Sequence, residues 1–514
     1  MRKLSYLLAK AFILLFVAGV SAQTTIGNKP VIDSAQMLRR TRHVVDTLSL
    51  NIQKTQDRPT LIDLYVRRGL GEGTLGHPDS AIYDYCAAIA IDSKLPEVYV
   101  YRSAQLQRIH KYAYAIGDLE MAISLLPNNP ARASMLYCYI SFIRRVLGSY
   151  DYALKADSAA IALNPNNGAA YISNGWTYLG MKEYEKAIEA FDAGISLTRN
   201  ASPKALSENL AARADAKRAL KKYKEAINDY SLALNVNPDD RRAHWNRAAC
   251  YNYNGDYELA DAEYTKTITY YAGDNANLTR LYCDRARMEM GEQKYKEALR
   301  DDSLATTCDD KYALAYWGMA DAYSQMGNFQ QSIHWYKETM KYYADNMGNK
   351  AALSYLNNNI ADADYFLAKY DEVVRAATTA IGLDAQAWSP YLNRGRAWLR
   401  LGKNDKAMED FNRVLVLDTT KAFAYAFALF YTGNADKAVK LMQDKAISTN
   451  NPAILISHYY NLACLYALMN KPDEANTYLK KCIDMGYSKR YAQLDPDLEN
   501  IRETLDFKTM TKTN

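Results

Sequence analysis

The sequence lacks the residue patterns on which most catalytic and metal sites depend. Its six histidines and seven cysteines are scattered along 514 residues, and they form no HExxH or CxxC motif. A phosphate-binding GxxxxGK[ST] loop and a GxSxG nucleophile motif are also missing from the sequence. The odd number and wide spacing of the cysteines fit neither a disulfide framework nor a zinc site. We therefore expect a protein that is not an enzyme, with no catalytic residue, no metal and no cofactor.

A large excess of charge of one sign is lacking too. The 63 Lys and Arg residues nearly balance the 58 Asp and Glu residues, which leaves a formal charge of +5. Three of these positive charges lie in the first 22 residues, so the rest of the chain is close to neutral. Nucleic acids and anionic membrane surfaces attract strongly basic chains, so we expect neither as a partner. The 13 prolines and 23 glycines leave little room for long disordered linkers.

Long hydrophobic runs are confined to the N-terminus. Residues 11–20 are apolar and follow two basic residues, a pattern typical of a secretory signal peptide and too short to span a bilayer as a helix. Residues 20–22, Val-Ser-Ala, supply the small side chains that precede a cleavage site. We expect cleavage between Ala22 and Gln23, no membrane span, and a periplasmic, cell-envelope or secreted location. The alternative for this stretch is a buried N-terminal helix.

The sequence is rich in small residues at a fixed spacing. They recur in twelve pairs, with eleven residues between the members of each pair. The first members, at position 8 of a repeat of about 34 residues, are Gly69, Ser103, Ser141, Gly175, Ala214, Ala248, Ala286, Ala320, Ala361, Gly395, Ala426 and Ala463. The second members, at position 20, are Ala81, Ala115, Ala153, Ala187, Ala226, Ala260, Ala298, Ser332, Val373, Ala407, Ala438 and Ala475. Small residues at this spacing let two antiparallel helices approach closely, and no strand pattern explains them.

Aromatic residues occupy other fixed positions of the same repeat. Of the 43 tyrosines, 19 lie at position 4, at position 17 between the two helices, or at position 24. We expect these rings to bury apolar area while their hydroxyls reach solvent at the hairpin edge. Pro and Asn follow the second helix in several copies and end it, as in residues 164–167.

This pattern resembles the tetratricopeptide repeat (TPR), a helical hairpin of about 34 residues. The resemblance implies an all-α fold, a right-handed superhelical solenoid of about twelve TPR helix-turn-helix hairpins with terminal capping helices. It divides the chain into a signal peptide (1–22), an N-terminal segment with a capping helix (23–61), the solenoid (62–489), and a C-terminal capping helix and tail (490–514). The copies that begin near Ser354 and Thr419 are the weakest, because several aromatic positions are lost there.

Extra residues follow every second repeat and make the repeat spacing alternate. They lie at 130–133, 202–206, 275–278 and 347–353. One interpretation is inheritance from a duplicated pair of repeats, and the other is a row of loops along one edge that a partner contacts. Both ends need covers, because a solenoid otherwise exposes an apolar face at each terminus. Residues 34–56 form an amphipathic stretch at one end, and residues 494–505 begin a proline-started, acid-rich helix at the other.

The resemblance also implies where a partner binds. In this family, the first helix of each repeat (helix A) lines a concave groove through positions 2, 5, 6, 9, 12 and 13. Asparagines at position 6 hold the backbone of extended peptides in similar proteins, because each amide both donates and accepts hydrogen bonds. The candidate groove residues here are Asn246, Asn359, Asn393, Asn461, Trp176, Trp245, Trp317, Tyr253, Arg396 and Arg400. Asparagine is also common on helix A for no functional reason, and some of the rings are expected to pack between adjacent A helices.

The function expected from these features is that of an exported scaffold or adaptor that binds protein or peptide segments in its groove. The partner's identity does not follow from the sequence. An alternative is a soluble-ligand receptor or accessory protein of an outer-membrane nutrient-uptake complex, although such receptors generally carry a lipid anchor and a second ligand region. A purely structural spacer would have a featureless groove, which the tryptophans argue against.

A last resemblance concerns modification. The signal peptide and the Gln start of the mature chain resemble exported proteins of the Bacteroidetes, which attach O-glycans at Asp-Ser or Asp-Thr followed by an aliphatic residue, Met or Thr. The candidate sites are Ser34, Thr47, Ser80, Ser158, Ser303 and Thr419. Ser34 is the leading candidate because it precedes the cap helix. The second helix (helix B) of these repeats also favours acid–small–small strings for packing reasons alone.

Overall fold

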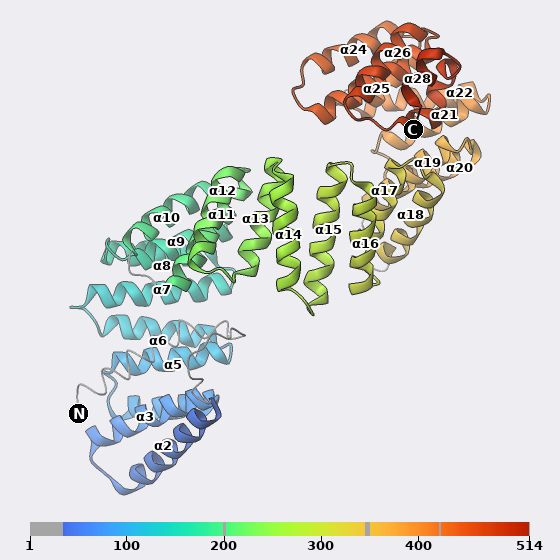
Figure 1. The fold of residues 1–514 in the computed structure, drawn as a ribbon. Coiled ribbons are helices and arrows are strands. Elements are labelled where there is room, and N and C mark those ends of the chain that lie inside the picture. Colours follow the sequence, from blue (N-terminus) through green and yellow to red (C-terminus); the bar gives the residue numbers. More distant parts are fainter. Residues whose placement is uncertain (1–33, 199–201, 345–349, 421–422, 513–514) are drawn as a thin grey trace. The chain divides into compact units, whose positions relative to one another are not determined.

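The computed structural model describes residues 34–198, 202–344, 350–420 and 423–512, and all regular structure in these ranges is helical (Figure 1). The expected signal peptide, residues 1–22, lies outside the described residues. The chain forms two compact units, residues 1–201 and 202–514. The repeats expected over residues 62–489 are thus shared between two units.

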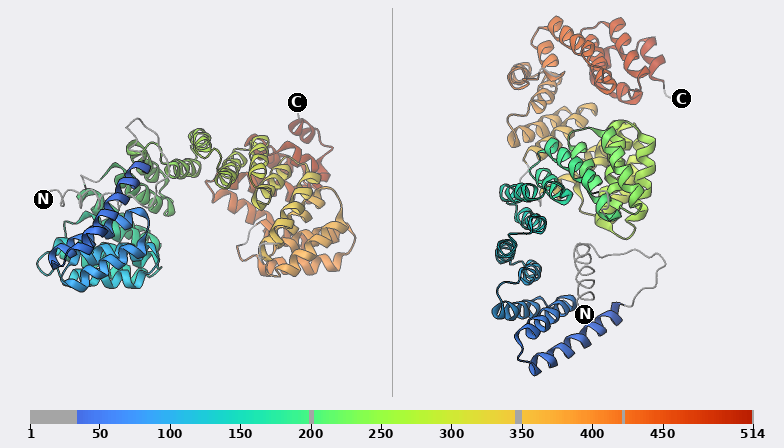
Figure 2. Two further views of the ribbon diagram at one scale, coloured as in Figure 1. Left: turned by 90° about the horizontal axis from the view of Figure 1, so that it is seen from below. Right: turned by 90° about the vertical axis from the view of Figure 1, so that its left-hand side faces the viewer.

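Helices follow one another in pairs along each unit. The first unit contains α2 (Ser34–Lys54), α3 (Arg58–Leu75), α4 (Pro78–Ile91), α5 (Pro96–Arg108), α6 (Tyr112–Ser124), α7 (Pro130–Val146), α8 (Tyr150–Leu163), α9 (Gly168–Gly180) and α10 (Tyr184–Leu197). The repeats of the second unit are built from α11 (Pro203–Ala219), α12 (Tyr223–Val236), α13 (Arg241–Asn254), α14 (Tyr257–Tyr270), α15 (Asn275–Gly291), α16 (Tyr295–Cys308), α17 (Ala313–Gln325), α18 (Phe329–Ala344), α19 (Lys350–Phe366), α20 (Tyr370–Leu383), α21 (Ser389–Arg400), α22 (Asn404–Leu417), α23 (Phe423–Tyr431), α24 (Ala435–Ile447), α25 (Pro452–Leu468) and α26 (Pro472–Asp484). The pairs from α3/α4 to α25/α26 are the twelve predicted hairpins, and within each unit they lie side by side in sequence order (Figures 1 and 2).

The small residues mark where the two helices of a hairpin touch. All twelve residues at position 8 and all twelve at position 20 are buried. At position 8 of three repeats a glycine accommodates the aromatic ring at position 24. A methyl group on Gly69, Gly175 or Gly395 would lie within 3.0 Å of the ring of Tyr85, Phe191 or Phe411, respectively.

The turn between helix A and helix B has one conformation throughout. The residue at position 15 has a positive φ in all twelve hairpins, and it is glycine in only six of them. The others include Lys221 with φ 59° and Ala368 with φ 55°. Position 17, expected in the turn, is instead the first residue of helix B from α6 to α20.

The extra residues of alternate repeats lengthen helix A. α7, α11, α15 and α19 each have 17 residues, whereas α5, α9 and α17 have 13. Three of the longer helices begin with a turn made from the extra segments, at Pro130, Pro203 and Asn275. The expectation of a row of loops is therefore wrong for these described segments, because capping at Asn129, Ser202 and Asp274 starts the helix there.

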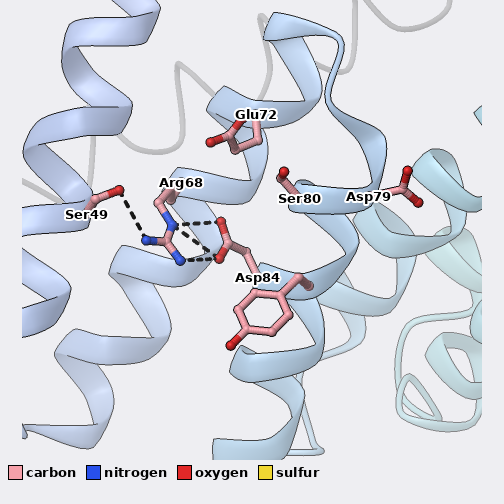
Figure 3. A pocket seen from close by; sticks show the side chains of 7 residues that line it. Ser49, Arg68, Glu72, Asp79, Ser80 and Asp84 are labelled. Carbon is pink, nitrogen blue, oxygen red and sulfur yellow. Dashed lines mark hydrogen bonds and ion pairs between the residues drawn. The ribbon is translucent and has the colours of Figure 1, made fainter.

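A buried ion pair joins helix A to helix B in six hairpins. An arginine at position 7 reaches a carboxylate at position 23, and the shortest N–O distances are 2.5 to 2.8 Å. The pairs are Arg68–Asp84, Arg102–Asp118, Arg213–Asp229, Arg247–Glu263, Arg285–Asp301 and Arg394–Asp410. Figure 3 shows the first pair, in which Arg68 also donates to Ser49 on α2. The other six hairpins carry no such pair of opposite charges at these two positions.

Both chain ends pack on the neighbouring repeats. On α2, Val45 and Leu48 are buried, whereas Met37 and Val44 of the expected apolar face are about half exposed. The C-terminal end consists of α27 (Lys489–Leu494), a 3₁₀ helix η1 (Pro496–Ile501) and α28 (Leu505–Thr511). Leu498 and Ile501 are buried in the core of the last hairpins, but Leu505 is 79% exposed.

Candidate groove site

The first part of the candidate groove lies on helices A of the second unit, from α11 to α15. Asn246 donates to Asp215 of the preceding repeat at 3.0 Å, and Trp245 donates from Nε1 to Asp284 of the following repeat at 2.9 Å. Arg242 forms an ion pair with Asp215, and the largely exposed Arg287 pairs with Asp284 at 2.9 Å. These side chains link three consecutive A helices into one polar row at groove positions.

Aromatic rings border this polar row. Tyr253 is 60% exposed and stacks on Tyr223 with ring centroids 5.2 Å apart. The ring centroids of Trp317 and Tyr355 are 5.5 Å apart, and Tyr355, on the next helix A, is exposed. We call the helix A surface from α11 to α17 the open row. It presents both aromatic faces and charged groups, the residue types that anchor protein partners.

Trp176 and Trp245 have packing partners of their own. Trp176, in the first unit, meets the buried Phe191 of its own hairpin edge to face at 5.8 Å. Trp245 packs against Tyr271 at 5.8 Å besides its hydrogen bond to Asp284. Both rings are half-buried, so they contribute to the joints within and between repeats as well as to the surface.

The second part of the candidate groove, on α19 to α25, holds a segment of the same chain. Tyr365 donates to Asp497 at 2.8 Å, and Arg396 forms an ion pair with the other oxygen of that carboxylate. Arg400 donates to the Pro496 carbonyl oxygen at 2.8 Å and pairs with Glu499 at 3.0 Å. Arg396 and Arg400 are therefore bound to η1. The expectation from the sequence, that they bind a separate partner, is not met in this structure.

Contacts of residues that precede Asp497 extend this binding mode. Tyr460 donates to Asp495 at 2.5 Å, and the ring of Tyr491 packs against Phe366 of α19 at 4.4 Å. The guanidinium of Arg396 lies 4.0 Å from the Tyr365 ring centre, a cation–π contact. Burial raises the pKa of Asp495, and the Asp497 carboxylate next to it adds to the shift.

The groove side chains in this part stand at the expected helix A positions. Tyr460 is at position 5, Arg396 at position 9, Tyr365 at position 12, and Arg400 at position 13 of their repeats. Helix A thus uses the predicted register to bind a segment that lies 35 to 132 residues further along the chain.

The candidate asparagines are in different environments. Asn246 is bound to Asp215, as above, and Asn393 is 5% exposed with its amide donating to Asn358 at 3.2 Å. Asn359 and Asn461 are half-buried. A row of four free asparagine amides is not what the structure contains, because Asn393 is used to join α19 and α21.

The tyrosines at position 24 do not follow the expectation that their hydroxyls reach solvent at the hairpin edge. Tyr230 and Tyr336 are buried, and their hydroxyls donate to Asp215 and Asp321 at position 9 of the same hairpins. The hydroxyl of Tyr85 is buried without a partner among the described residues. These hydroxyls reach inward across the hairpin rather than to solvent, because the ring inserts deeply against the small residue at position 8.

The candidate glycosylation sites fall into two groups. Asp157, Asp302 and Asp418, which precede Ser158, Ser303 and Thr419, are buried, so packing accounts for the acidic residue there. Asp46 and Asp79, together with Thr47 and Ser80, are exposed. Thr419 is in a turn, whereas Thr47, Ser80, Ser158 and Ser303 are on helices. The side chain of Ser34 lies outside the described residues.

Two further features bear on the class of site. Residues 71–76 match the string Gly-x-Gly-x-x-Gly, but they end α3, whereas a dinucleotide-binding fingerprint follows a strand and opens a helix. The described ranges contain no group of three potential metal ligands. None of their helices is both long and apolar enough to cross a bilayer.

The sequence interpretation missed the position 7–23 ion pairs. It expected residues 494–505 to cap the last repeat but missed the contacts of this segment with α19 and α21. The ion pairs have a signal in the sequence, because arginine at position 7 always occurs with an acidic residue at position 23. The bound segment has none, because its contacts are not periodic.

The described ranges form stacked helical hairpins, and A helices of the last repeats contact a segment of the same chain. Family models for the tetratricopeptide repeat match residues 169–200, 313–346, 358–426 and 458–485, and a TPR repeat model matches residues 214–255. The chain belongs to the tetratricopeptide-repeat proteins.

Similar curated proteins include human tetratricopeptide repeat protein 6, which is 21% identical over 54% of this chain and 59% of its own length. The human protein O-mannosyl-transferase TMTC3 is 28% identical over 45% of this chain and 24% of its own length. This chain therefore spans about 59% of the first relative and about a quarter of the second.

Solved structures with a similar arrangement include a tetratricopeptide repeat protein from Parabacteroides merdae, at 19% identity. It has a TM-score of 0.38 and covers 52% of this chain and 98% of its own. Yeast Tom70, at 14% identity, has a TM-score of 0.38 and covers 83% of this chain and all of its own.

Proposed function

We propose that this protein is an exported adaptor that binds extended segments of other proteins on its A helices. One observation carries the proposal: helix A side chains at positions 5, 9, 12 and 13 already bind a protein segment, residues 495–499. They bind its three carboxylates and one main-chain carbonyl oxygen, as a receptor for a peptide segment requires. In the repeats that begin at Arg241, Thr279 and Ala313, these positions are exposed or half-buried except for Cys283, which is buried.

The surface open to a partner is the row from α11 to α17. Tyr253 is 60% exposed there, Tyr355 borders the row from α19 and is 53% exposed, and the Arg287 side chain is 61% exposed. Aromatic and arginine side chains contribute most of the free energy in many protein interfaces. The partner segment therefore lies on this row and does not require Asn393, Arg396 or Arg400.

A pair of matched variants tests this proposal. Tyr253→Ala with Arg287→Ala alters the groove, whereas Leu259→Ala alters an exposed apolar residue on helix B of the same hairpin. Each protein is expressed in its native cells, crosslinked and purified, and the captured proteins are quantified. We expect one or more partners to fall by at least about tenfold with the groove variant, as the loss of two anchors predicts. Equal loss with Leu259→Ala, or no loss with the groove variant, would refute it.

Export and O-glycosylation belong to the same proposal. The apolar stretch before Gln23 supports export, and the exposed Asp46-Thr47 and Asp79-Ser80 pairs support modification there, with Ser34 as the third candidate. Intact-mass measurement of the protein from its native envelope should give the mass of residues 23–514 plus carbohydrate. Replacing Ser34, Thr47 and Ser80 with alanine should remove the addition. A mass without carbohydrate would exclude the modification, and a mass that includes residues 1–22 would exclude cleavage.

A further inference from the structure

Three groove residues on α19 and α21 donate hydrogen bonds to the bound segment. Arg396 and Arg400 supply guanidinium groups, and Tyr365 supplies a hydroxyl that donates to Asp497. Guanidinium groups cannot accept hydrogen bonds and bind carboxylates through several N–H groups at once. The chemistry that fits these three side chains is an acidic peptide segment with a free carbonyl oxygen between its acids, as in Asp497, Glu499 and the carbonyl of Pro496.

The bound segment has two different faces. Leu498 and Ile501 of η1 are buried in the core of the last hairpins, with residues of α25 and α26. Asp497 and Glu499 face away from that core toward α19 and α21. The acidic face can therefore leave its site while the apolar face still covers the last hairpin.

The acidic face is held by interactions of small net free energy. Removing a carboxylate and a guanidinium from water offsets most of their attraction, so a buried ion pair adds little to stability. Asp362 also lies near Arg396. Burial is the main cause that raises the pKa of Asp362; the Asp497 carboxylate raises it further, whereas Arg396 lowers it. The Nε group of Arg396 is buried without a partner among the described residues. A hollow of about 230 Å³ beside Asp497, bordered by Leu399 and Leu468, is left open by η1.

We propose that Tyr365, Arg396 and Arg400 form a receptor for a short acidic segment of a partner protein, and that Asp497 and Glu499 occupy it until such a segment replaces them. This inference rests on the proposed function but concerns other repeats than the open row. Because the resident segment is tethered, its effective concentration is of the order of millimolar. Weak ligands are therefore excluded, and the site opens only to a partner that binds tightly or is already held by the open row.

The test uses the full chain and a labelled peptide with the sequence of residues 493–500. The opened variant is Asp497→Asn with Glu499→Gln, which weakens the resident segment and leaves the receptor intact. By fluorescence anisotropy, the opened variant should bind the peptide at least about tenfold more tightly than the unmodified chain, as release from a tethered competitor predicts. Adding Arg396→Gln to the opened variant should abolish binding. A peptide with asparagine in place of both aspartates should not bind to any of these proteins.

Three results would overturn the proposal. The first is a folded opened variant, with cooperative unfolding, that binds the peptide no more tightly than the unmodified chain. The second is a variant that dimerises without binding peptide, which would assign the site to a second copy of this chain. If the opened variant does not fold, Glu499→Gln alone is used instead, because the Glu499 side chain is 60% exposed. This variant should bind the peptide about threefold more tightly than the unmodified chain. No gain in affinity is the third contrary result. None of these results involves Tyr253 or Arg287, so the adaptor proposal is tested separately.

Discussion

Individual glycines decide how closely two helices of a hairpin can pack. A methyl group on Gly395 would lie 2.7 Å from Cε1 of Phe411, which is fully buried. We expect Gly395→Ala to lower the free energy of unfolding of the second unit by roughly 1–3 kcal/mol, the usual cost of overpacking. The control is Gly382→Ala on α20, which has open space around it and should gain roughly 0.5–1 kcal/mol. Denaturant titration measures both, and equal effects would contradict the packing argument.

Glu289 is one of several buried carboxyl groups whose raised pKa makes stability depend on pH. Burial raises the pKa of Glu289 on α15 to about 7, and the neighbouring Asp301 carboxylate adds to the shift. At a pH between the two pKa values, the folded chain keeps the proton on Glu289, whereas the unfolded chain has lost it. The free energy of unfolding therefore falls as pH rises from about 4.3, the unfolded pKa, to about 7.

Replacing Glu289 with glutamine removes this titration. The Glu289→Gln variant should melt at a higher temperature than the unmodified chain at pH 8.5 and at about the same temperature near pH 4.5. The matched control, Glu258→Gln, changes an exposed residue in the first turn of α14 and should leave the pH dependence unchanged. A uniform shift of the Glu289→Gln melting temperature at all pH values would show that the group does not titrate as described.

At the scale of the hairpin, the sequence was most informative. The small pair at positions 8 and 20 predicts the contact between two helices, and all 24 of these residues are buried. Ala260 is fully buried against Ala248 and Tyr264. Ala260→Leu should therefore overpack the hairpin and cost roughly 1–3 kcal/mol in unfolding free energy. Denaturant titration tests this value, and a loss below about 0.5 kcal/mol would mean that the two helices can move apart freely.

The ion pairs between helices A and B can be replaced rather than simply broken. Asp410→Asn leaves Arg394 half-buried without its carboxylate and should be clearly destabilising, by up to about 3–5 kcal/mol. The double change Arg394→Ile with Asp410→Ala copies the repeat that begins at Ser354, which has Ile360 and Ala376 at these positions. It should restore most of the stability. A double variant as unstable as Asp410→Asn would show that the ion pair itself is needed.

The element boundaries were harder to predict from the sequence. The residues between alternate repeats read equally well as loops, yet three of these segments begin a longer helix A. Local capping decides this: Asn129, Ser202 and Asp274 accept hydrogen bonds from the first turn. Ser134 and Ser207 then donate to carbonyl groups of helix B in the same hairpin, a contact that follows only from the three-dimensional arrangement.

At the scale of the whole molecule, contacts between distant residues are what the sequence could not predict. The repeat explains neighbours about 34 residues apart, but Tyr365 and Asp497 are separated by 132 residues. Two arginines at correct groove positions were therefore assigned to an external partner, whereas an internal segment binds them. The division into two units is likewise not visible in the repeat, which continues across residue 201.

The central claim is that partners bind on the A helices of the open row. A photo-crosslinking amino acid placed at Tyr253 or, in a separate protein, at Leu259 compares two exposed sites of one hairpin, which are 60% and 53% exposed. Irradiation in native cells followed by mass spectrometry should give a defined protein adduct from position 253 and none from position 259, and the Arg287→Ala change should reduce the first. Adducts from position 259 alone would place the binding surface on helix B and contradict the account.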